Sequence, residues 1–223
     1  MKMSSSGFAP RRRQGGFIQG AILFALVIIA VVVAAFSLAN RDSQSSADSE
    51  QARVNASFML KVGNDLQTGI NRAIADGLAP SDLVSKMVFA PTEADGELDL
   101  FDPTLKYMIR PQFPNTALVD PDEQPFDVDN VATAVTWTQT DITDVGGDDQ
   151  EAVIQVSGLK EDVCKRINVT ANGVLVSAAL PGAIDDTTSS GWREGCFNGG
   201  ATAGFVYYRV VATDVAAAAP TTP

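Results

Sequence analysis

The longest apolar stretch of the chain lies near its start. Residues 17–39 read FIQGAILFALVIIAVVVAAFSLA, and all of them except Gln19, Gly20 and Ser37 are apolar. As a helix this segment would rise about 35 Å, which is enough to cross a hydrocarbon layer of roughly 30 Å. The valines and isoleucines at 27–33 would favour a strand in water, but a lone strand leaves its backbone groups unpaired in lipid. We therefore expect a membrane-spanning helix over residues 17–39.

A second helical pattern follows the apolar segment. Residues 40–50 are polar and serine-rich, so they form either a flexible linker or the middle of one long helix. Beyond them, apolar residues recur every four positions and predict an amphipathic helix over about 51–76 that ends at Gly77. The predicted apolar face consists of Phe58, Val62, Leu66, Ile70 and Ile74, with Val54, Met59 and Ala73 alongside. Gly63 and Gly69 each cost this helix about 1 kcal/mol relative to alanine, so tertiary packing must hold it.

The rest of the chain alternates between short helical and strand patterns, which is typical of a small α+β head. The segment 90–130 is rich in proline and acids and predicts a loop with one short edge strand. A glycine-rich turn at 145–148 separates two alternating runs and predicts a β-hairpin. The expected elements are a helix over about 81–88, the edge strand at 106–110, hairpin strands at 131–138 and 152–156, a helix at 159–169, a strand at 204–212, and a disordered tail from about 214.

Charge is distributed unevenly. The chain has 16 Lys and Arg residues, 27 Asp and Glu residues, and no His, for a net charge of −11. Four of the basic residues lie before position 14 and every acid lies at or beyond Asp42, so residues 40–223 carry −15. This balance argues against nucleic-acid binding, which needs a cationic face. The basic start and acidic remainder place the N-terminus in the cytoplasm and residues 40–223 outside it.

Three fates of the apolar segment remain open at this point. It is an uncleaved anchor, or a secretory signal peptide with small residues at Ser37 and Ala39 for cleavage, or a helix that is kept after trimming on its cytoplasmic side. The third fate is suggested by residues 11–17, which read RRRQGGF. A short basic leader that ends in glycine, followed by phenylalanine and an apolar run, resembles the class III signal of type IV pilins and pseudopilins.

This resemblance implies specific roles for the N-terminal residues. Prepilin peptidase would cut after Gly16 and leave a methylated Phe17 at the start of the mature chain. The retained helix would pack among helices of other pilin subunits through residues that include Gln19, Ala21, Ile22, Phe24 and Phe36. The resemblance also implies an inner-membrane assembly platform as a partner, and a bacterial inner-membrane location before assembly into a periplasmic or extracellular filament.

The resemblance also predicts how the chain is divided into segments, and the sequence departs from the family's pattern at one position. It predicts a leader at 1–16, an assembly helix at 17–39, an amphipathic continuation of that helix at 40–77, and an extracytoplasmic head at 78–223 whose antiparallel sheet is covered by the helix.

Family members usually carry glutamate at the fifth mature position, and here that position is Ala21. A buried carboxylate needs a partner such as a free amine. Because some family members that initiate or cap filaments also lack this glutamate, Ala21 favours a minor or tip subunit; the alternative is that the chain is not a filament subunit.

The two cysteines, Cys164 and Cys196, fall in the predicted extracytoplasmic part, where a disulfide is the default state and free thiols are the alternative. A disulfide between them would close a loop of 31 intervening residues. On the chain-entropy model this would stabilise the fold by about 3–4 kcal/mol. A bridge here also resembles the disulfide-bounded C-terminal region of many type IV pilins. A catalytic cysteine would lack a histidine partner, because the chain contains none.

Motifs that carry chemistry are missing from the sequence. It contains no G-x-S-x-G, no P-loop and no G-x-G-x-x-G. Residues 120–124 begin like a calcium loop, but Pro125 stands where glycine is required and Val131 where a bidentate glutamate is required. We therefore expect no cofactor, with an irregular Ca²⁺ site as the alternative. The sequence favours a non-enzymatic filament subunit over a membrane-anchored extracytoplasmic binding domain that does not polymerise, and over a secreted enzyme.

Overall fold

The computed structural model describes residues 47–90, 96–129, 131–147, 149–200 and 204–215. The chain from residue 49 onward is one compact unit. Across the described ranges, none of the helices combines the length and apolar content needed to cross a membrane. The predicted span at 17–39 lies outside these ranges.

A long helix occupies residues 47–75. The first four of these residues, which could have belonged to a linker, are helical. Its buried hydrophobic residues are spaced three or four apart, as a 3.6-residue repeat requires, and they are Ala52, Ala56, Met59, Val62, Leu66, Ile70 and Ala73. The predicted row with a step of four was correct only at its centre. Such a row winds around the helix, so Phe58 and Ile74 are half-buried and Val54 is 60% exposed.

The fold is α+β, with one antiparallel sheet of four strands in the order β3-β4-β6-β5. The strands are β3 (Val135–Thr140), β4 (Gln150–Leu159), β5 (Glu194–Asn198) and β6 (Phe205–Val215). The predicted hairpin is confirmed by the pairing of β3 with β4. β6 lies in the centre of the sheet and pairs with β4 on one side and with β5 on the other.

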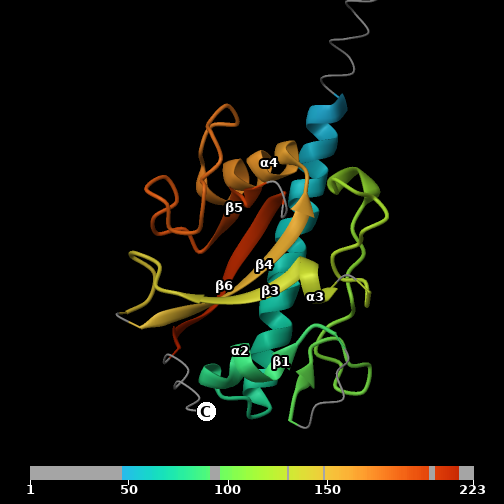
Figure 1. Cartoon of the computed structure of the whole chain (residues 1–223), viewed down its shortest axis with the longest axis vertical. Helices are drawn as coiled ribbons and strands as arrows, with labels where there is room; N and C mark the ends of the chain where they lie inside the picture. Colours follow the sequence, from blue (N-terminus) through green and yellow to red (C-terminus); the bar gives the residue numbers. More distant parts are fainter. Residues whose placement is uncertain (1–46, 91–95, 130, 148, 201–203, 216–223) are drawn as a thin grey trace, which may run out of the picture. The chain divides into compact units, whose positions relative to one another are not determined.

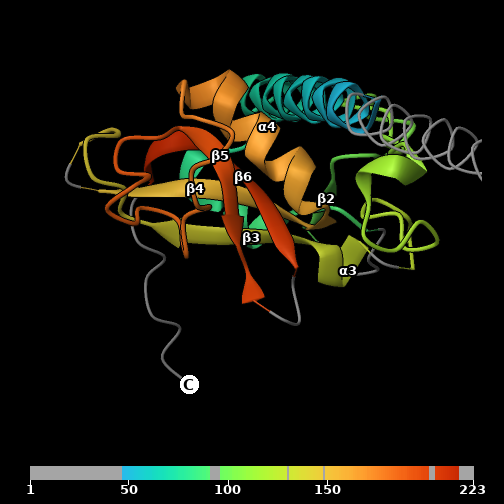
Figure 2. The ribbon, with the colours of Figure 1, turned by 90° about the horizontal axis from the view of Figure 1, so that it is seen from above.

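The long helix and α4 (Glu161–Asn172) cover the same face of the sheet (Figures 1 and 2). The predicted helix at 159–169 is therefore confirmed, with Val163, Cys164 and Ile167 buried. α4 ends at Gly173, whose φ of 69° is the left-handed conformation that glycine adopts readily. Arg166 of α4 donates a hydrogen bond to Ser49 of the long helix, so the two helices contact each other as well as the sheet.

β6 separates two cores. Tyr207 and Val211 face the helices and belong to the larger core. Tyr208 and Val210 face the opposite side, where Ile142 and neighbouring loop residues cover a smaller core. The alternation predicted for this strand is thus confirmed. The strand continues to Val215, beyond the predicted start of the disordered tail, and residues 216–223 lie outside the described part.

The segment between the long helix and the sheet differs most from its prediction. The predicted helix at 81–88 is shorter, because Met87 and Val88 leave it to form a strand. The predicted strand at 106–110 is wrong: Lys106 has a φ of 57°, which breaks an extended chain. The elements here are a 3-10 turn at Pro80–Asp82, α2 (Leu83–Lys86), a parallel pair of β1 (Met87–Val88) and β2 (Leu98–Asp99), a 3-10 turn at Asn115–Ala117, and α3 (Val131–Ala134).

The hairpin itself begins four residues later than predicted. Val131 starts the helical turn α3, and β3 begins only at Val135. Val131 is nevertheless fully buried, so its apolar character reflects the core and not the strand. Trp137 of β3 donates a hydrogen bond from its indole nitrogen to the Met87 carbonyl oxygen at 2.8 Å, which ties β1 to the sheet.

Candidate functional site

The structure tests only part of the predicted site residues. The expected processing residues Gly16 and Phe17 lie outside the described ranges, as do Gln19, Ala21, Ile22, Phe24 and Phe36 of the assembly segment. Cys164 and Cys196 form the predicted disulfide. Both are fully buried, with Cα atoms 5.3 Å apart, and the bridge joins α4 to β5.

α4 also closes the outer edge of β5 with side-chain amides. Asn168 donates to the Cys196 carbonyl oxygen at 2.8 Å and accepts from the Cys196 N–H at 2.7 Å. Asn172 donates to the Glu194 carbonyl oxygen at 2.9 Å. These bonds take the place of a further strand beside Glu194 and Cys196 of β5.

β6 has 11 residues and β5 has 5, so part of β6 extends beyond β5. β5 begins at Glu194, opposite Arg209, and the last backbone bond on this side runs from the Val210 N–H to the Arg193 carbonyl oxygen at 2.8 Å. Residues 211–215 of β6 pair only with β4 among the described strands. This part of the sheet edge is not covered by a strand.

The open portion of β6 also carries two β-bulges. Its register with β4 runs from Val153 opposite Val210, to Ala152 opposite Ala212, to Gln150 opposite Val215. β6 thus contains two more residues than β4 over this stretch, and extra residues in a bulge leave the ladder. The Val211 carbonyl oxygen accepts a hydrogen bond of 2.6 Å from the Gln67 side chain on the long helix. Bulges often stand beside functional sites because they re-aim the chain.

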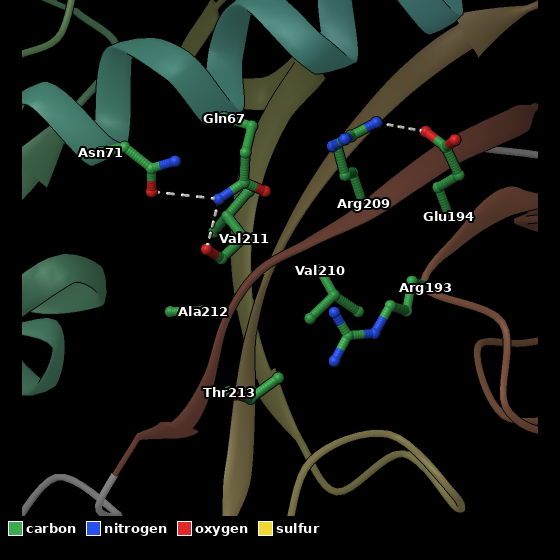
Figure 3. Close-up of a pocket in the computed structure, with 9 residues that line it drawn as sticks. All are labelled: Gln67, Asn71, Arg193, Glu194, Arg209, Val210, Val211, Ala212 and Thr213. Carbon is green, nitrogen blue, oxygen red and sulfur yellow. Dashed lines mark hydrogen bonds and ion pairs between the residues drawn. The ribbon is translucent and has the colours of Figure 1, made fainter.

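A groove of about 600 Å³ follows this open edge (Figure 3). Gln67 and Asn71 reach into it from the long helix, and the bulged backbone of β6 crosses it. Arg193 enters from the segment just before β5. The lining residues are Gln67, Asn71, Arg193, Glu194, Arg209, Val210, Val211, Ala212 and Thr213.

One end of the groove is held by an ion pair between Arg209 and Glu194, which are 16% and 27% exposed. Arg209 also donates to the side-chain oxygen of Asn64 on the long helix at 2.9 Å. Glu194 accepts a second hydrogen bond, of 3.1 Å, from the Tyr207 hydroxyl. Burial raises the pKa of Tyr207 above its ordinary value, so the phenol stays protonated and acts as a donor. The charge of Arg209 is therefore compensated within the fold.

Arg193 differs from Arg209 in its surroundings. Its side chain is exposed, and within the described part of the chain it forms no ion pair and no hydrogen bond. It therefore supplies the uncompensated positive charge of the groove. Together with the amides of Gln67 and Asn71 and the bulged backbone, it makes an arrangement suited to binding an extended chain that carries negative charge.

The sequence pattern did not predict this groove. One signal was present: Arg209 interrupts an apolar strand, and a charge in such a position needs a partner inside the fold. No group of three or more metal-ligating side chains is found among the residues that the structure describes. The chain matches no protein-family model, no curated protein and no solved structure.

Proposed function

We propose that this chain is a structural, non-enzymatic subunit of a type IV pilus or a related secretion filament, trimmed by prepilin peptidase after Gly16. Its apolar segment would remain on the protein, stored first in the inner membrane and then packed among the helices of other subunits. The acidic head would face solvent.

The observation that carries the proposal is the arrangement along the chain. A basic leader that ends in Gly16-Phe17 precedes the apolar segment at 17–39. The described part of the long helix begins at residue 47, and the helix covers one face of an antiparallel sheet. The C-terminal part of the head contains a disulfide-bounded region between Cys164 and Cys196, followed by β6. A helix that serves both as an assembly rod and as the support of the head fits this order.

Ala21 refines the proposal. The family's usual glutamate at this position would pair with the free amine of a neighbouring Phe17, and a buried amine without that partner is costly. We therefore propose a minor or tip subunit, which makes few contacts with identical neighbours.

Replacement of the leader glycines tests the proposal. A Gly16→Trp variant should keep its full length and fail to enter filaments, because the peptidase accepts only a small residue before the cut. Gly7→Trp makes the same substitution earlier in the leader and should be trimmed and assembled normally. Chain length by gel mobility and recovery in sheared filaments are the measurements. Normal trimming and assembly of Gly16→Trp would contradict the proposal, and a full-length wild-type chain would favour a simple membrane anchor.

A further inference from the structure

The open edge of β6 is the part of the described head that the proposed function does not use. The edge of β5 is closed by Asn168 and Asn172 of α4, as described above. Beyond Val210, the Val211 carbonyl oxygen accepts a hydrogen bond from the Gln67 side chain, and β5 does not pair with residues 211–215. An unpaired strand edge is a template for pairing with another chain.

The volume of the groove is compatible with such pairing. A paired strand lies about 4.8 Å from its neighbour, and five regular residues span about 17 Å. The groove of about 600 Å³ falls within the usual size of binding clefts. Gln67 and Asn71 line it on the helix side, Arg193 lies beside Val210, and Thr213 lies further along β6 (Figure 3).

Charge indicates what kind of chain would bind. Residues 40–223 carry a net charge of −15, which repels acidic chains in general. Arg193, however, stands at the point where β5 would continue alongside Val210. A carboxylate next to this guanidinium would form a charge-assisted hydrogen bond, whereas a cation there would be repelled.

We propose that the groove binds an extended, acidic segment of a different protein, which adds to β6 as a strand in line with β5. The segment pairs its backbone with the bulged portion of β6 at residues 211–215 and places an Asp or Glu side chain against Arg193. Backbone pairing supplies affinity, and the carboxylate supplies selectivity. This inference goes beyond the filament proposal and does not depend on it.

Selection from a library of random seven-residue peptides tests this inference, with the full chain in detergent micelles as the target. Bound peptides should share an acid at one fixed position. Arg193→Glu should weaken their binding at least tenfold. Lys106→Glu makes the same charge change at an exposed residue outside the groove and should leave binding within twofold.

A backbone readout separates strand addition from simple charge attraction. Methylation of single amide nitrogens in a selected peptide should weaken binding at least tenfold at alternate positions and little at those between them. The inference is overturned if no peptide is enriched, if Arg193→Glu leaves binding unchanged, or if methylation is tolerated throughout. Enrichment of this chain's own segments would make a second copy the occupant and would also overturn it. Trimming at Gly16 is unaffected by any of these results.

Discussion

Gly63 lets the long helix lie directly against β6, and replacing it by alanine tests how the head is held together. A Cβ at this position would overlap the hydroxyl oxygen of Tyr207 and lie 3.0 Å from its Cζ and 3.3 Å from the Cδ of Arg209. Tyr207 is fully buried and its hydroxyl is bonded to Glu194. The ring therefore has little room to withdraw.

Two effects of opposite sign decide the result. In an exposed helix, Gly→Ala stabilises by about 1 kcal/mol. Overpacking of a core costs about 1–3 kcal/mol, and displacing the Tyr207 hydroxyl from a charged acceptor costs about 1.5–3 kcal/mol more. The sum is a destabilisation of about 1.5–5 kcal/mol for Gly63→Ala.

Urea unfolding of the full chain in detergent micelles, followed by the fluorescence of Trp137 and Trp192, measures this change. In the double variant Gly63→Ala with Tyr207→Phe, the overlapping oxygen is gone. The two changes should therefore cost about 1–2 kcal/mol less together than the sum of each alone. Thr68→Ala, at an exposed position of the same helix, is the control and should change stability by at most about 0.5 kcal/mol. A Gly63→Ala variant that is more stable than wild type would refute the close approach of Gly63 to the Tyr207 hydroxyl. So would a double variant whose loss of stability equals the sum of the two single losses.

Three further predictions concern the rest of the head. Replacing Cys164 and Cys196 together by alanine should lower the free energy of unfolding by about 3–4 kcal/mol in the same urea assay; an unchanged midpoint would contradict the role of the bridge. Glu194→Gln leaves a largely buried guanidinium without its counter-charge and should cost about 2 kcal/mol; a loss that vanishes in high salt would instead indicate a solvent-exposed pair. The pKa of Asp186 lies below its ordinary 3.8 because the carboxylate accepts a hydrogen bond from the Gly182 N–H. Asp186→Asn should therefore lower the free energy of unfolding above pH 3.8, and the difference between variant and wild type should shrink as the pH falls below that value. A difference in stability that grows as the pH falls would contradict this prediction.

Elements whose hydrophobic pattern repeats along their own residues were predictable from the sequence. Val62, Leu66 and Ile70 lie on the buried face because one period of a long helix repeats over many turns. The strand that contains Tyr207 and Tyr208 alternates between Tyr207 and Val211, so its two faces there follow directly. The disulfide followed from the expected compartment and from the presence of two cysteines alone.

Elements that depend on distant partners were not predictable. β5 reads EGCFN and has no regular alternation; it is a strand because β6 pairs with it on one side and Asn168 bonds its other edge. Gly63 had a visible local cost, but only the approach of Tyr207 explains it. The groove arises because β6 is longer than β5 and because two bulges change the direction of β6. A difference in length between paired strands is a tertiary property, and no local pattern encodes it.

The mass of the mature N-terminus tests the central claim most directly. Intact and peptide mass spectrometry of the protein recovered from membranes and from sheared filaments should show a chain that begins at Phe17, with one added methyl group on its amine. A chain that begins at Asn40 would mean that the apolar segment is discarded, and a chain that begins at Met1 would mean that it is never trimmed. Either result would contradict a filament subunit.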